Sequence, residues 1–302
     1  MRLANEKFRA VAQGLTVFIA ALFAGCASMP PETAPPVAVS APRFTETPNL
    51  KIVVSIPPQK DLVQRLAGEH AEVISLMSAN DDFTDANFQP AGTLAAAQLY
   101  FRFGAPFEKK LAAPDGCKVY SMLKGVKLTP LARHVESLLS ETGKFSGPDY
   151  YIWLSPSRMV RMLTVVYQAL READPDHIDD YTLNYTRLTR DLNSLEGDIQ
   201  RVLLDRLSSE VLVYQPVLGY FCEDFGLTQF SADVTSAPDL ARAAIEKKIR
   251  AVLLTNSIGE VGAQLPQLLN GTVARVNPLS GDYFGNLRQI AAAIAGRSGE
   301  YN

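Results

Sequence analysis

The sequence is poor in the side chains that bind transition metals most tightly. Its 302 residues include three cysteines and three histidines, at Cys26, Cys117, Cys222, His70, His134 and His177. No two cysteines form a CxxC pair, which excludes a cysteine-based zinc knuckle. Such sparse cysteines also argue against a disulfide-stapled mini-domain. We expect the three histidines to be solvated or capping residues.

The sequence also lacks a strong charge excess and the common catalytic motifs. Its net charge is −3, so nothing favours a nucleic-acid partner. The motifs GxSxG and HExxH and the phosphate-binding P-loop do not occur, and no GxGxxG follows the first predicted strand. A hydrolase lacks the nucleophile–base pair that it would need. The sequence therefore predicts a protein that is not an enzyme and has no catalytic residues.

The N-terminus has the pattern of an export signal. Arg2, Lys7 and Arg9 precede the short apolar run Leu15–Ala24, which is too short to span a bilayer. The run ends in LFAGC, which resembles the lipobox of bacterial lipoproteins, whose cysteine carries the lipid. We predict a signal peptide over residues 1–25 and lipidation of Cys26, and the alternative is a plain cleaved signal with an incidental cysteine.

A proline-rich tether is predicted over residues 26–50. It contains six prolines and no glycine after Cys26, so it is expected to be extended and semi-rigid. No later segment is long and apolar enough to cross a membrane. The expected location is the cell envelope, with the chain held to a membrane by its lipid and facing the periplasm or the cell surface.

Strands and helices alternate after the tether. Short apolar or β-branched runs predict strands at Lys51–Ile56, Glu72–Met77, Tyr100–Phe103, Cys117–Met122, Glu210–Tyr214, Thr228–Ser231, Ala251–Leu254 and Val273–Val276. Helical patterns lie between most of them, including Leu94–Leu99 and Phe107–Ala112 in the first half. Such alternation predicts an α/β fold with parallel sheets covered on both faces. The isolated acids Glu108, Glu223 and Asp224 are expected to be solvated.

A long helix divides the two blocks of alternation. Apolar residues recur every three or four positions from Ile178 to Val202, which predicts one helix over residues 176–206. A coiled-coil dimer is the competing interpretation, although the stripe is short for one. The prediction is an N-terminal lobe at 51–175 and a C-terminal lobe at 207–302. Cys117 and Cys222 fall in different lobes, which argues against a disulfide bond between them.

Several fragments resemble the metal-binding components of zinc/manganese ABC importers of the cluster A-I type. In chain order these fragments are Ser55–Pro58, Phe88–Pro90, Gly104 with Phe107–Glu108, Ile152–Pro156, Asp174–Pro175, Leu218–Phe221 and Asn277–Leu279. The resemblance implies two (βα)4 lobes joined by a rigid helix. It also implies a metal ion, zinc or manganese, held between the lobes by three histidines and one carboxylate.

All four implied ligand positions carry other residues in this sequence. The positions equivalent to the family's metal ligands are Ala86, Tyr151, Gln215 and Asn277. None of them offers an imidazole or a carboxylate, so no metal site and no cofactor is predicted and tight zinc binding is doubtful. Beside Ala86 the sequence has Asp81, Asp82 and Asp85. This acidic segment is either a site for a hard cation with oxygen ligands or a solvated loop.

The resemblance implies a solute-binding lipoprotein that works with an ABC permease. A cleft between two lobes is the usual place for a ligand. The alternative is a structural or interaction lipoprotein that kept the fold and lost solute binding, an interpretation that the replaced ligand positions favour.

Overall fold

The computed structural model describes residues 50–90, 94–138, 145–231, 236–255, 259–269 and 271–297. The predicted signal peptide, Cys26 and the tether up to residue 49 lie outside these ranges. Within them, no helix combines the length and the apolar character that crossing a membrane requires.

The N-terminal lobe is built on a four-stranded parallel sheet in the order β2-β1-β3-β4. Its strands are β1 (Leu50–Val54), β2 (Ala71–Ser75), β3 (Leu99–Arg102) and β4 (Lys118–Ser121). The central strands β1 and β3 are almost entirely buried, as expected for a parallel sheet with both faces covered.

The C-terminal lobe contains a five-stranded parallel sheet in the order β5-β7-β6-β8-β9. Its strands are β5 (Glu136–Ser137), β6 (Glu210–Val213), β7 (Thr228–Ser231), β8 (Ala251–Leu254) and β9 (Thr272–Arg275). Strand β5 precedes the long helix in the chain and was not predicted, since two residues give no periodic pattern. The predicted lobe boundaries at residues 175 and 207 stay a prediction.

Seven α-helices occur in the described part of the chain. They are α1 (Pro57–Ala67), α2 (Pro156–Ala173), α3 (Ile178–Leu203), α4 (Gly219–Phe225), α5 (Ala237–Glu246), α6 (Gly259–Leu268) and α7 (Tyr283–Ile294). Helix α2 begins where Ser155 caps the backbone N–H of Arg158, with Pro156 in its first turn. The same device starts α7, where Asp282 caps the N–H of Gly285.

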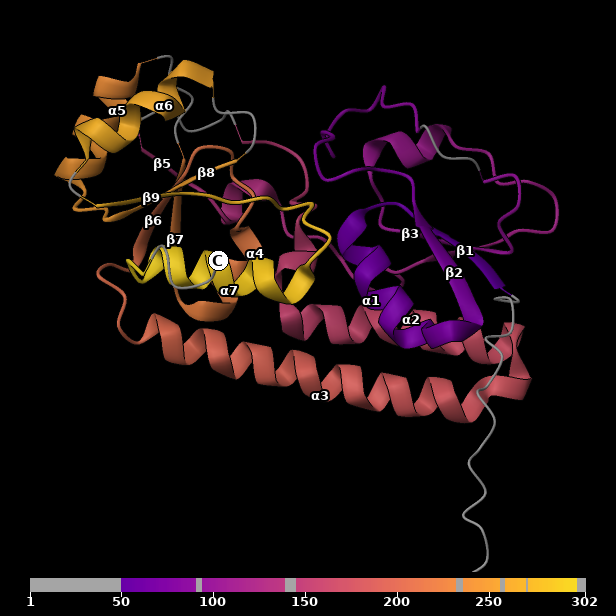
Figure 1. The fold of residues 1–302 in the computed structure, drawn as a ribbon. Helices are drawn as coiled ribbons and strands as arrows, with labels where there is room; N and C mark the ends of the chain where they lie inside the picture. The colour runs from indigo at the N-terminus through magenta and orange to yellow at the C-terminus, as the bar shows by residue number, and fades with distance from the viewer. Residues whose placement is uncertain are drawn as a thin grey trace, which may run out of the picture. The chain divides into compact units, whose positions relative to one another are not determined.

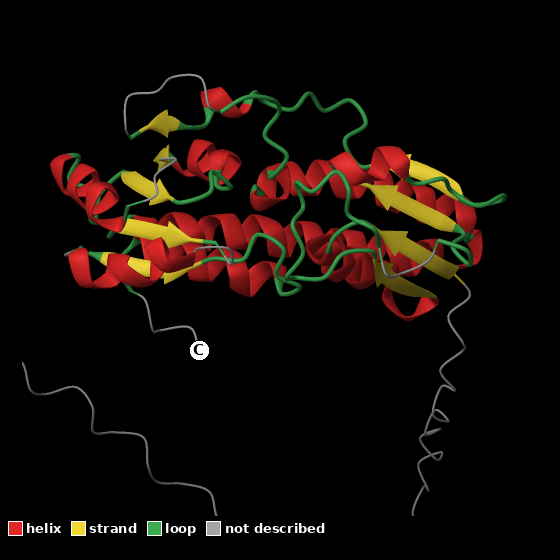
Figure 2. Cartoon of the chain, turned by 90° about the horizontal axis from the view of Figure 1, so that it is seen from above, coloured by secondary structure: helices red, strands yellow, loops and turns green. Residues whose placement is uncertain are grey.

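Helix α3 connects the two lobes. Its buried stripe of Tyr181, Leu188, Leu192, Leu195, Ile199 and Leu203 confirms the predicted periodicity. The stripe packs on α2, on α1 of the N-terminal lobe and on α7 of the C-terminal lobe. Figure 1 shows α3 running beneath both lobes, with α2 beside it, and Figure 2 shows the two sheets at opposite ends of this helical layer. The predicted fold class of two parallel α/β lobes on a long helix is confirmed.

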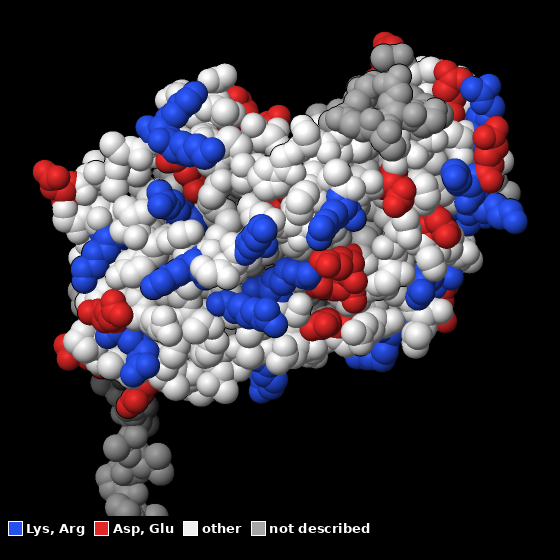
Figure 3. Space-filling view, turned by 180° about the vertical axis from the view of Figure 1, so that it is seen from behind, with Lys and Arg blue, Asp and Glu red and all other residues white. Residues whose placement is uncertain are grey.

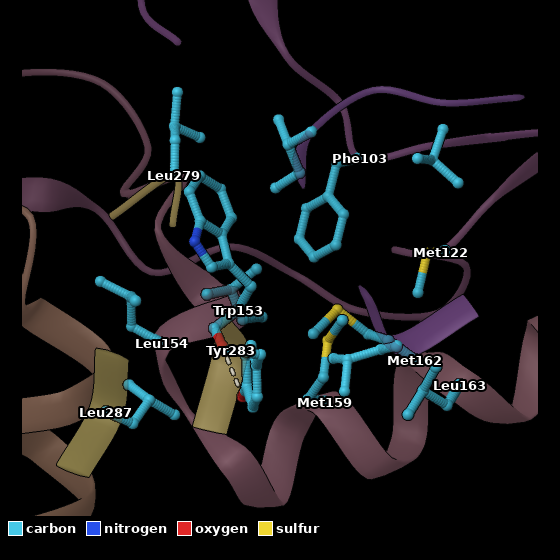
Figure 4. Packing of buried hydrophobic residues seen from close by; sticks show 14 of the residues in the cluster. Phe103, Met122, Trp153, Leu154, Met159, Met162, Leu163, Leu279, Tyr283 and Leu287 are labelled. Atoms are coloured by element: carbon cyan, nitrogen blue, oxygen red, sulfur yellow. Dashed lines mark hydrogen bonds between the residues drawn. The ribbon is translucent and has the colours of Figure 1, made fainter. Parts of the chain in front are cut away.

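An aromatic core joins the lobes near the start of α2. The Trp153 indole lies between Phe103 and Leu279 (Figure 4), and its Nε1 donates a hydrogen bond of 2.7 Å to the carbonyl of Pro278. The Tyr283 hydroxyl donates to the Trp153 carbonyl at 2.7 Å. Pro278 thus fixes the side chain of Trp153 and Tyr283 fixes its backbone carbonyl, and both residues follow β9 of the C-terminal lobe.

Two helix predictions in the N-terminal lobe are wrong. Of the predicted helix at residues 94–99, residues 94–98 form a turn, and Leu99 starts β3. Only Leu94 and Ala97 are buried in this turn, so the alanine-rich run has too short an apolar stripe to hold a helix against the sheet. The predicted helix at residues 107–112 is a short 3-10 turn, Pro106–Lys110.

The predicted solvation of Glu108 is also wrong, and His134, expected to be solvated or capping, follows a 3-10 turn with a side chain that is only 5% exposed. Glu108 is 4% exposed and accepts hydrogen bonds from Ser55 Oγ and from the backbone N–H groups of Phe103 and Gly104. Burial raises the pKa of Glu108 above its ordinary value, although these hydrogen bonds oppose the shift.

The surface carries charges of both signs. On the face shown in Figure 3, basic and acidic side chains are interspersed.

Candidate functional site

A cavity of about 190 Å³ lies where the two lobes meet. It is lined by Ala79, Asn80, Asp81, Asp82, Phe83, Tyr151, Gln215, Thr255, Asn277, Pro278 and Leu279. Most of these residues follow the carboxyl ends of β2, β6, β8 and β9. Ligands of open α/β sheets bind at this end of the strands, so the topology alone marks the cavity as the candidate site.

Three of the four predicted site positions come together in this cavity. Tyr151, Gln215 and Asn277 all line it, whereas Ala86 is an exposed loop residue outside its lining. The cavity wall on that side is formed by residues 79–83 instead. The equivalence of the four positions to metal ligands remains a prediction.

Tyr151 is held against an aromatic wall. Its ring centroid lies 5.2 Å from that of Trp153 and 6.0 Å from that of Phe83. Burial raises the pKa of the Tyr151 phenol well above its ordinary value, and the nearby charges of Asp82 and Asp149 raise it further. The phenol therefore stays protonated at neutral pH, where a metal ion would need the phenolate.

The two amide side chains already have partners. Asn277 donates from Nδ2 to the carbonyl of Ala79 at 3.0 Å and accepts from the N–H of Leu279 at 2.9 Å. Gln215 Oε1 accepts from the Thr255 hydroxyl at 2.6 Å. The Asn277 bond to Ala79 connects the two lobes across the cavity, so this side chain acts as a bridge between them.

The aspartates of the cavity are partly committed to their own loop. Asp81 accepts from the Ser78 N–H at 2.6 Å, and Asp82 accepts from the Thr84 N–H at 2.9 Å. Across the described residues, no three His, Cys, Asp or Glu side chains lie together as metal ligands. The donor set is thus amide, hydroxyl and carboxylate oxygen, and it does not fit the imidazole-rich coordination that favours zinc.

Sequence reasoning missed Thr255 and Phe83. Thr255 follows the last residue of β8, and a polar residue at the end of a predicted strand was a usable signal. No local pattern marks Phe83, which depends on the tertiary fold to reach Tyr151 and Trp153.

A bilobal α/β body with a small cavity between its lobes is the architecture expected of a solute-binding protein. The family model "ZnuA: Zinc-uptake complex component A periplasmic" matches residues 52–296. The chain therefore belongs to this family of cluster A-I metal-binding solute-binding proteins, which are not enzymes.

Individual relatives agree with this assignment. A "Putative metal-binding protein" of Chlamydia muridarum is 27% identical over 264 residues, covering 83% of this chain and 92% of that protein. The crystal structure of ZnuA superposes with a TM-score of 0.70 at 25% identity, covering 82% of this chain and 99% of that one. A zinc-bound ZnuA deletion mutant superposes with a TM-score of 0.69, also at 25% identity.

Proposed function

We propose that this chain is the solute-binding component of an ABC importer, tethered to a membrane through Cys26, whose inter-lobe cavity does not hold zinc tightly. The family implies the partner, which is a permease of the same transport complex. The observation that carries it is the lining of the cavity, which brings Tyr151, Gln215 and Asn277 together. The resemblance predicts that these three residues occupy positions of the family's metal ligands.

The contacts of these three residues support weak zinc binding. Tyr151 is kept neutral by burial, and the Gln215 oxygen is engaged by Thr255. The Asn277 amide donates to Ala79 across the cavity and accepts from the N–H of Leu279 in its own segment, so both of its ends are engaged. A zinc ion would have to break these bonds and would gain only neutral oxygen ligands and the free oxygens of Asp81 and Asp82.

The Asn277 bridge also favours the alternative, a structural or interaction protein that kept the fold. This bond links the lobes through the protein's own groups, as a bound ligand would. The alternative predicts that no small molecule protects the protein against unfolding, and a thermal-shift screen of metal salts and small polar solutes separates the two functions.

The zinc test compares the natural chain with a triple variant, Tyr151→His with Gln215→His and Asn277→Asp. Ligand that binds the native state alone stabilises by about 2.7 kcal/mol at 100 times its dissociation constant. We expect micromolar zinc to raise the melting temperature of the triple variant through the cavity. In the natural chain we expect no zinc binding that depends on the cavity.

The control is Gln215→Ala with Asn277→Ala, which removes both amides from the cavity. The zinc affinity of this control, measured by calorimetry, should equal that of the natural chain. One zinc per chain bound below micromolar concentration and lost on replacing Gln215 or Tyr151 would refute the proposal and restore zinc as the solute.

A further inference from the structure

A second cavity, of about 430 Å³, lies in the C-terminal lobe next to α4. It is lined by Thr129, Arg133, His134, Val135, Glu136, Gly219, Cys222, Glu223, Leu227, Thr228 and Gln229. None of these residues lines the cavity between the lobes. The residue of interest is His134, whose side chain is only 5% exposed.

Asp149 fixes the orientation and the tautomer of His134. The His134 Nδ1–H donates to Asp149 Oδ2 at 2.7 Å, and Asp149 Oδ1 accepts from the Tyr151 N–H at 2.9 Å. A carboxylate only accepts, so the proton must be on Nδ1 and the neutral ring carries its lone pair on Nε2. The Tyr220 ring, 4.6 Å away edge to face, holds the imidazole from the side.

His134 Nε2 is buried and has no hydrogen-bond partner. It is the one side-chain nitrogen or oxygen of this kind in the described ranges. Leaving a buried polar atom unsatisfied costs about 1–3 kcal/mol, so it calls for an explanation. The nearest acid is Glu223, whose Oε2 lies 3.5 Å from Nε2 without the geometry of a hydrogen bond.

The spacing of these two atoms is that of two ligands on one metal ion. Ligands about 2.1 Å from a tetrahedral zinc ion lie about 3.4 Å apart. A metal-binding histidine typically donates its other ring N–H to a carboxylate, as His134 does to Asp149. We propose that His134 Nε2 and Glu223 Oε2 bind a zinc-like divalent cation in this second cavity.

The site is built for modest affinity. Glu223 is half-exposed and also accepts from Arg158 at 2.5 Å, so the ion must compete with a guanidinium. Cys222 lines the same cavity but is itself buried at 2% exposure, so the site is assigned to His134 and Glu223 alone. Water from the cavity fills the remaining positions, and binding in the micromolar range is expected.

The test is zinc chloride titration of the full chain by calorimetry, followed by anomalous X-ray diffraction from zinc-soaked crystals. We expect one zinc per chain at His134 and Glu223, with affinity falling tenfold or more in both His134→Gln and Glu223→Gln. Glu223→Gln is the safer variant for folding, because this side chain is half-exposed. Glu246→Gln, which neutralises an exposed glutamate at the end of α5 outside both cavities, is the matched control and should keep the affinity.

Three results would overturn the site. They are no zinc binding by the natural chain at millimolar concentration, equal affinity in the natural chain and Glu223→Gln, or an anomalous peak away from His134. The inter-lobe proposal has its own readout, the Gln215→Ala with Asn277→Ala variant, so either one can fail without the other.

Discussion

A single glycine determines whether the His134–Asp149 pair can form. A Cβ at Gly219 would lie 2.1 Å from Asp149 Oδ2 and 2.4 Å from His134 Nδ1. No real Cβ approaches another heavy atom so closely, so any larger residue at position 219 has to displace the pair. The first turn of α4 can pack against the dyad only because this side chain is missing.

We expect Gly219→Ala to lower the free energy of unfolding by about 2–4 kcal/mol, from overpacking together with damage to a buried hydrogen-bonded pair. The matched control is Gly197→Ala inside α3, where a new Cβ meets no atom within 4 Å. That change should stabilise by about 0.5–1 kcal/mol. Urea unfolding of the two variants measures whether each change raises or lowers the free energy of unfolding. Equal stability of Gly219→Ala and the natural chain would contradict the placement of His134.

The family resemblance pointed to three residues that line the inter-lobe cavity, Tyr151, Gln215 and Asn277, and to Ala86, which lies outside its lining. The resemblance singled out these residues, and Gln215 and Asn277 directly follow β6 and β9, whose positions are set by local pattern. Ala86 lies in a long loop, where nothing in the sequence fixes which residue faces the cavity. The pairing of His134 with Asp149 depends on packing between segments that have no repeating pattern, so it was not foreseen.

At the scale of elements, the corner between α2 and α3 is held by charged groups. His177 Nδ1 lies 2.7 Å from Asp174 Oδ2, and the Tyr181 hydroxyl donates to the same oxygen at 2.6 Å. The hydrogen bond to Asp174 raises the pKa of His177 above its ordinary 6.5. Burial alone would raise the pKa of Asp174, but the bonds from Tyr181 and His177 outweigh it and lower that pKa below 3.8.

These shifts give the corner a pH window. Because its pKa is raised in the folded state, His177 stabilises that state fully below its unfolded pKa near 6.5. This stabilisation is lost as the pH rises through the folded pKa. Because its pKa is lowered in the folded state, Asp174 stabilises that state above its unfolded pKa of 3.8. This stabilisation is lost as the pH falls through the folded pKa. We expect the melting temperature of the natural chain to exceed that of His177→Gln most between about pH 4 and 6.5, with the gap narrowing as the pH rises above 6.5. A gap that widens from pH 6 to pH 8 would contradict the pairing.

Elements with strong periodicity were predicted well. The strands around residues 210–275 and the stripe of α3 match the structure within a few residues, because buried parallel strands and amphipathic helices each leave a repeating pattern. Strand β5 and the turn at residues 94–98 were missed, since their conformation is set by neighbours distant in the sequence.

At the scale of the whole molecule, attachment to a membrane is the prediction that rests on sequence alone. If Cys26 is lipidated, intact-mass analysis of membrane-extracted protein should show a chain that begins at a lipid-modified Cys26. Cys26→Ser should release the protein from the membrane fraction or block its maturation. If the natural chain is recovered without detergent and its Cys26 is unmodified, the predicted lipid anchor is wrong.

The continuous α3 helix has a consequence for how long a solute stays bound. A helix that packs on both α1 and α7 can let the lobes swing apart only by bending, which breaks backbone hydrogen bonds worth about 0.5–1.5 kcal/mol each. Movement of the 79–83 loop would open the cavity without that cost, because these residues form one of its walls. Loop motions take nanoseconds to microseconds, whereas domain hinges take microseconds to milliseconds. Residence time should therefore be governed by the contacts of this loop, the Asn277 bond to Ala79 among them.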